Sequence, residues 1–137
     1  MVNFIYPNYK QRAIGLGDSV SANLLAGAVT VSLIDTGTYT YDNAHWYISN
    51  VGGASIIANS SALGSKTTVN GVFDAANVVF SSVTGTTAEA VIIWIDTGTE
   101  TTSPLVAYLD TNITGLPVTP NGGDINLNWA TGGIFAI

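Results

Sequence analysis

Cysteine is absent from this chain and positive charge is scarce, and each absence excludes functions. Without cysteine, the 137 residues can form no disulfide bond and offer no thiolate for catalysis or metal binding. Lysine and arginine together number three against nine acidic residues, which gives a formal net charge of −6. Proteins that bind nucleic acid neutralise its phosphates with such bases, so we expect no nucleic-acid partner.

Long apolar runs are missing as well. The longest, residues 90–95, is far shorter than the ~18 residues that a membrane-spanning helix requires, and we expect no membrane partner. The first residues lack the basic and apolar segments of a secretory signal, which predicts synthesis in the cytoplasm. His45 is the only histidine and the acidic residues are scattered, so we expect neither a multi-histidine metal site nor a cofactor.

What the chain does contain is the pattern of a β protein: short β-branched and aromatic runs separated by turn residues. Residues 29–33 and 125–129 alternate between apolar and polar, which predicts strands with one face in the core and one in solvent. Residues 78–80 and 90–95 are continuously apolar, which predicts strands buried on both faces.

The clearest supersecondary element is a hairpin over residues 90–109. Two apolar strands are joined there by residues 96–104, and we expect the tip at 99–102 to be exposed. Strands of this length with frequent turns favour an antiparallel sandwich or barrel. The predicted fold class is therefore all-β, a single domain with short helical turns.

Helix-forming sequence is scarce. Asp18 could cap one short helix over residues 19–25, and Asp42 could cap another over residues 45–48. Both segments are short, so we expect them to add turns to a β domain and no helical layer.

Two strand-like runs end in Asp-Thr-Gly, at Asp35 and Asp96, as the catalytic loops of aspartic proteases do. Those enzymes hold one water between two carboxylates. The two copies here lie about sixty residues apart, too close for two protease lobes, and a third strand ends at Asp110 without the glycine. Asp and Thr side chains also form local backbone bonds, and glycine supplies positive φ. We interpret all three segments as turns and expect no enzymatic activity; a protease remains the least favoured alternative.

The N-terminal segment concentrates apolar and aromatic residues with two of the three bases. An exposed apolar segment of this kind on an isolated domain would promote aggregation. We therefore interpret residues 1–12 as an arm that contacts a neighbouring subunit, ahead of a β domain at residues 13–137. The candidate partner-binding residues of the arm are Phe4, Ile5, Tyr6, Tyr9, Lys10 and Arg12.

A second group of candidate partner-binding residues lies in a loop-rich segment and consists of Tyr39, Tyr41, Trp46 and Tyr47. Aromatic side chains of this kind can stack on a sugar or a peptide, and they can equally pack against another subunit. Charged residues make up 9% of the chain, against about 25% in an average globular protein. With so little charge, we expect part of the surface to be buried in a homo-oligomer.

Several segments, most of them in the C-terminal half, carry a resemblance to a known family. They are residues 3–6 with Lys10, 31–36, 87–93, 96–99, 102–111 and above all 115–125, followed by Trp129 and Ile134-Phe135. In these segments the chain resembles a family of small structural proteins found in tailed bacteriophages and prophages. Its most specific block reads Leu-Pro-Val-Thr-Pro-Asn-Gly-Gly-Asp.

The resemblance implies a component of the virion. Within the virion, a capsid cement or decoration protein fits best, a trimer that stabilises the head by binding between capsid subunits. Its partners would be the major capsid protein or other virion proteins, together with further copies of itself. The alternative is a receptor- or glycan-binding module of a head or tail fibre that uses the aromatic residues of segment 39–47.

Overall fold

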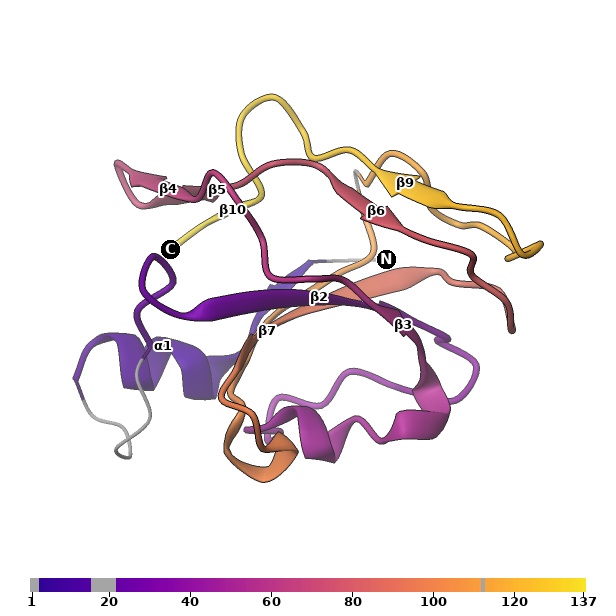
Figure 1. Cartoon of the computed structure of the whole chain (residues 1–137). Helices are drawn as coiled ribbons and strands as arrows, with labels where there is room; N and C mark the ends of the chain where they lie inside the picture. The colour runs from indigo at the N-terminus through magenta and orange to yellow at the C-terminus, as the bar shows by residue number, and fades with distance from the viewer. Residues whose placement is uncertain (1–2, 16–21, 112) are drawn as a thin grey trace.

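A computed structural model describes residues 3–15, 22–111 and 113–137, and the structural statements below concern these residues. The chain forms two facing β layers, with loops and short helices beneath them (Figure 1). The lower β layer is one antiparallel sheet with the strand order β1-β8-β7-β2-β3. Its strands are β1 (Phe4–Ile5), β2 (Ala28–Ile34), β3 (Ile56–Asn59), β7 (Ala90–Asp96) and β8 (Leu105–Leu109).

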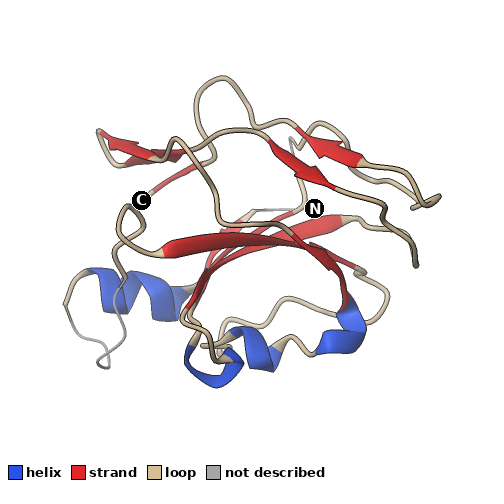
Figure 2. Cartoon of the chain, in the orientation of Figure 1, coloured by secondary structure: helices blue, strands red, loops and turns tan. Residues whose placement is uncertain are grey.

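The upper β layer consists of two smaller antiparallel sheets, with the orders β10-β5-β4 and β6-β9. Its strands are β4 (Thr67–Val69), β5 (Val72–Asp74), β6 (Val78–Phe80), β9 (Ile125–Leu127) and β10 (Phe135–Ala136). Every strand pair is antiparallel, and helix is confined to short segments (Figure 2). The prediction of an all-β, sandwich-like fold is confirmed.

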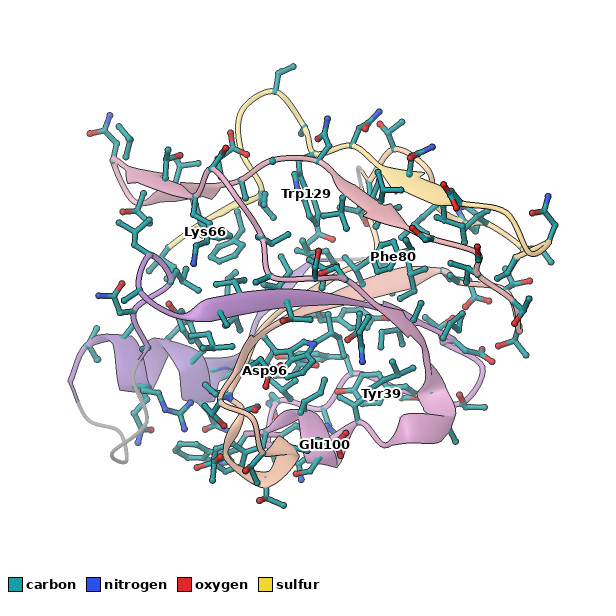
Figure 3. The ribbon with its side chains drawn as sticks, in the orientation of Figure 1. Tyr39, Lys66, Phe80, Asp96, Glu100 and Trp129 are labelled. Atoms are coloured by element: carbon teal, nitrogen blue, oxygen red, sulfur yellow. The ribbon has the colours of Figure 1, made fainter. Side chains whose placement is uncertain are left out.

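Strands β2 and β7 form the centre of the lower sheet and are covered on both faces. Phe80 and Trp129 lie above this sheet and Tyr39 lies below it (Figure 3). The predicted two-sided burial of β7 is confirmed, because residues 90–95 are all buried. The hairpin from β7 to β8 is also confirmed, and a 3-10 helix, η3 (Glu100–Thr102), forms its exposed tip.

The prediction of a solvent-facing side for β2 is wrong, because the layer beneath the sheet covers that side. Thr30 and Ser32 are buried there. The hydroxyl of Ser32 accepts a hydrogen bond from Trp94 Nε1 at 2.8 Å and donates one to Asn59 Oδ1. A polar side chain can therefore sit in the core, since its hydrogen-bonding groups are satisfied.

Strands β6 and β9 of the two-stranded upper sheet have the same burial pattern, although their sequences predict different patterns. In β9, Ile125 and Leu127 are buried while Asn126 is exposed, which confirms the predicted alternation. In β6 the same pattern appears, and the exposure of Val79 corrects the predicted two-sided burial. The reason is position: β6 belongs to the outer layer, so only one of its faces meets the core.

The helices differ from those predicted. Helix α1 (Pro7–Ala13) was not expected, although Pro7 at its first turn is a recognised start signal. The predicted helix at 45–48 is wrong, because Asp42 Oδ1 instead accepts from the Ala44 N–H in a local turn. Two 3-10 helices follow, η1 (Ile48–Asn50) and η2 (Gly53–Ser55). Of the helix predicted at 19–25, residues 22–25 are not helical and the others lie outside the described residues.

The N-terminal segment is built into the domain in the single chain, and its expected contact with a neighbouring subunit stays a prediction. Phe4 and Ile5 pair with Tyr108 and Ala107 of β8, and the Tyr6 N–H donates to the Val106 carbonyl. The chain then continues directly into α1. Among the described residues, α1 and the 3-10 helices are all too short and too polar to cross a membrane.

Candidate functional site

The structure brings the two predicted groups of aromatic residues together beneath the lower sheet. We call the result the tyrosine cluster: Phe4, Tyr6, Tyr39, Tyr41 and Tyr108. The rings of Phe4 and Tyr41 stack with their centroids 4.1 Å apart and their planes 8° from parallel. Tyr108 comes from β8, and no sequence pattern groups this strand residue with the others. Its ring lies 5.7 Å from that of Tyr41 and 6.2 Å from that of Tyr39.

A chain of polar contacts runs from the buried end of the cluster to the surface. The Tyr6 and Tyr39 hydroxyls lie 2.8 Å apart, and the Tyr39 hydroxyl lies 3.0 Å from His45 Nδ1. His45 Nε2 is 3.8 Å from Asp42 Oδ2. A neutral imidazole with its hydrogen on Nε2 lets Tyr39 donate to Nδ1 and Tyr6 donate to Tyr39. In this arrangement each buried hydroxyl hydrogen has an acceptor.

Burial keeps the hydroxyls of the cluster protonated. It is the largest cause of the raised pKa of Tyr6, and the neighbouring Tyr39 adds to the rise. Burial also raises the pKa of Tyr39, and together with the Asp110 charge it raises that of Tyr108 to about 12. Neutral hydroxyl groups at physiological pH suit a packed and hydrogen-bonded core better than a general base.

The loop that carries Tyr39 and Tyr41 is fastened to α1 by side chains of that helix. Asn8 Nδ2 donates to the carbonyl oxygen of His45 at 3.0 Å. Arg12 is buried, and its guanidinium carbon lies 5.2 Å from the ring centroid of Trp46 and 5.6 Å from that of Tyr47. Cation–π contacts of this kind stabilise a desolvated arginine. The N-terminal segment and the 39–47 loop therefore bind each other.

Exposure divides the ten candidate partner-binding residues. Tyr6, Tyr9, Arg12 and Tyr39 are buried within their own subunit. The remaining candidates keep accessible surface: Phe4, Ile5, Lys10, Tyr41, Trp46 and Tyr47. Whether a partner contacts these six stays a prediction.

The Asp-Thr-Gly segments are turns, as predicted. In each, the aspartate Oδ1 accepts from the backbone N–H of the glycine two residues later, at 2.8 Å for both Asp35 and Asp96. Asp35 follows the end of β2 and Asp96 ends β7, and these strands are antiparallel neighbours. At ~3.3 Å per residue, the two aspartates therefore lie about 20 Å apart in one chain. Two carboxylates at that separation cannot share a water.

An apolar groove that the sequence did not predict opens between α1 and the small three-stranded sheet. Its volume is about 210 Å³, and the residues that line it are Tyr9, Asn23, Leu24, Leu25, Thr68, Gly71, Phe73, Phe135 and Ile137. They come from four separate parts of the chain, so no local pattern could have indicated the groove. Small-molecule sites usually measure ~300–1,000 Å³, so this groove suits one or two side chains better than a cofactor.

No group of three or more histidine, cysteine, aspartate or glutamate side chains in the described part of the chain could hold a metal ion. A comparison with models of known protein families finds no match for the chain, and a comparison with curated proteins finds no significant match either.

Proposed function

We propose that this chain is a structural protein of a bacteriophage virion, a capsid cement or decoration protein. In this proposal it binds between capsid subunits as a homotrimer. The main support is the resemblance of segments 87–93 and 115–125 to a family of small structural proteins of tailed bacteriophages. These segments are far apart in the sequence, and they form one connected unit in the fold.

The connections within this unit are backbone hydrogen bonds. Ala88 and Val118 exchange two of them, at 2.8 and 3.0 Å. Val83 donates to Gly123 at 3.0 Å and accepts from Gly122 at 2.7 Å. The block at 115–125 thus braces the loop that leads into β7. A rigid virion component needs bracing of this kind. The bracing hydrogen bonds join backbone groups of the chain itself and require no bound ligand.

The proposal is tested by adding the purified chain to capsids assembled without it. We expect saturable binding at a fixed number of copies per capsid, together with a higher temperature of capsid disruption. An unrelated acidic protein serves as the control and should neither bind the capsids nor raise their disruption temperature. Failure of the chain to bind capsids of the phage that encodes it would contradict the proposed function.

A glycan- or receptor-binding module is the second candidate, and one observation favours it. The rings of Trp46 and Tyr47 lie 6.3 Å apart and both keep accessible surface. Such a pair can stack on a sugar ring. Titration with a panel of soluble glycans, followed by tryptophan fluorescence, tests this function. A saturable change lost in Trp46→Ala would favour the module over the cement protein.

A further inference from the structure

We propose that the apolar groove receives the exposed edge of the tyrosine cluster from a second copy of this chain. This inference rests on the self-association included in the proposed function. It goes further by naming the two surfaces that meet. One surface carries apolar side chains with lysines, and the other carries aromatic side chains with carboxylates.

The groove has the features of a docking surface for large side chains. Its floor contains Phe73, which is almost fully buried, and apolar side chains project at its rim. Leu25 is 49% exposed and Ile137 is 62% exposed. Two such residues at the rim of one groove form a surface whose burial would be favourable.

The two accessible lysines of the chain belong to the same end of the molecule. Lys10 lies on α1 next to Tyr9 of the groove, and its side chain is exposed. Lys66 precedes β4, and its ammonium group donates to the carbonyl oxygen of Gly27 (Figure 3). The end of α1, strand β4 and the C-terminus all lie at the left of Figure 1. The acidic side chain on the strands β4, β5 and β10 is Asp74, which accepts from the Ala75 N–H.

The exposed edge of the tyrosine cluster is complementary to this surface. Phe4 is 36% exposed and stacks on Tyr41, which is partly exposed. Asp42 directly follows Tyr41 in the chain, and the backbone N–H of Asp110 donates to Oδ1 of Asn3, which precedes Phe4, so both acidic residues adjoin the aromatic edge. The side chain of Asp42 is 52% exposed. Two basic side chains belong to the same region: Arg12 is buried against Trp46 and Tyr47, and His45 Nε2 lies 3.8 Å from Asp42 Oδ2.

Charge complementarity selects a second copy as the occupant. A chain with net charge −6 repels its copies on average, and contact is favoured only where lysines of one copy meet carboxylates of another. The surface around the apolar groove and the exposed edge of the tyrosine cluster provide that match, and both surfaces also carry apolar side chains. Because the two surfaces differ, the contact is head-to-tail. Such contacts form closed rings when the rotation between copies allows it.

The experiment measures the mass of the purified chain by sedimentation equilibrium, with a monomer of 14.2 kDa as reference. We expect the wild type to form oligomers that weaken as salt is raised. Lys10→Glu at the groove and Asp42→Lys at the cluster should each weaken self-association on the order of tenfold or more. The same two changes combined in one chain should restore it.

Mixing the two single variants is the decisive experiment. A Lys10→Glu chain keeps its cluster edge, and an Asp42→Lys chain keeps its groove, so an equimolar mixture should form hetero-oligomers more strongly than either variant associates alone. Leu25→Ser should weaken association, while Val79→Ser, its matched control on β6, should not. Glu100→Lys at the hairpin tip is the charge control.

A wild type that sediments as a monomer would overturn the inference, as would equal effects of Leu25→Ser and Val79→Ser. An Asp42→Lys chain that loses its native circular dichroism is replaced by Asp110→Lys, to which the same expectations apply. Failure of this contact is distinguishable from failure of the proposed function. A monomer that still binds capsids would refute only the contact, and an oligomer that does not bind them would refute only the function.

Discussion

Truncation of Tyr6 tests whether the N-terminal segment belongs to the folded domain. The Tyr6 side chain has no exposed surface, and it lies between the lower sheet and the loop that carries Tyr39. Removing a fully buried large aromatic side chain costs about 3–5 kcal/mol. Small domains are stable by only about 5–15 kcal/mol, so Tyr6→Ala should remove a large part of the stability.

A matched variant separates packing from hydrogen bonding. Tyr6→Phe keeps the ring and removes the hydroxyl that contacts the Tyr39 hydroxyl at 2.8 Å. Tyr39 still has His45 as a hydrogen-bond partner, so the loss should be about 1 kcal/mol. We therefore expect Tyr6→Ala to cost at least twice as much as Tyr6→Phe.

The assay is urea unfolding followed by the fluorescence of the three tryptophans, with stability taken from the linear dependence on urea. Val79→Ala, an exposed apolar position, serves as the control and should change stability by less than about 0.5 kcal/mol. A Tyr6→Ala variant within about 1 kcal/mol of the wild type would refute the reasoning. It would mean that the segment is a dispensable arm after all.

Three further predictions concern the rest of the fold. Gly115→Ala should destabilise the domain by more than about 3 kcal/mol in the same urea assay, because φ is +112° and a Cβ would collide with the Asn126 carbonyl; Gly64→Ala, with open space around it, should not. Ser32→Ala should cost about 1–3 kcal/mol and alter the near-ultraviolet circular dichroism, since the buried Trp94 Nε1–H loses its acceptor. Burial raises the pKa of Tyr9 and Tyr108 from 10 to about 12. A raised folded-state pKa contributes stability that is fully present below pH 10 and is lost as the pH rises toward 12. Tyrosinate absorbance should therefore rise together with unfolding in this window, and full tyrosine ionisation in a folded protein would contradict the burial.

Sequence patterns predicted the fold where one local signal decides the outcome. The apolar run of β7, the hairpin to β8 and the Asp-Thr-Gly turns were predicted correctly, because propensity and turn chemistry act over a few residues. The same local chemistry acts at Asn70-Gly71, where both residues have positive φ, at 53° and 77°, in the two-residue turn between β4 and β5.

The patterns failed where distant segments decide burial. The alternating pattern suggests that Ser32 faces solvent, but in the folded chain Ser32 is buried, and Trp94 and Asn59 satisfy its hydrogen bonds. The sequence around Tyr6 suggests an adhesive arm, but in the folded chain β8 and the loop of Tyr39 enclose the Tyr6 side chain. The groove could not be predicted, because Tyr9, Phe73 and Ile137 meet only in the folded chain.

The most direct test of the proposed function is a reconstruction of tailed-phage particles assembled with and without this chain. We expect density for the two-layered β domain on the head, seated between capsid subunits around a three-fold axis. The same particles assembled without the chain should lack that density. Particles in which the chain is missing from the head, or in which it lies in a tail fibre with the Trp46 surface outward, would contradict the cement assignment.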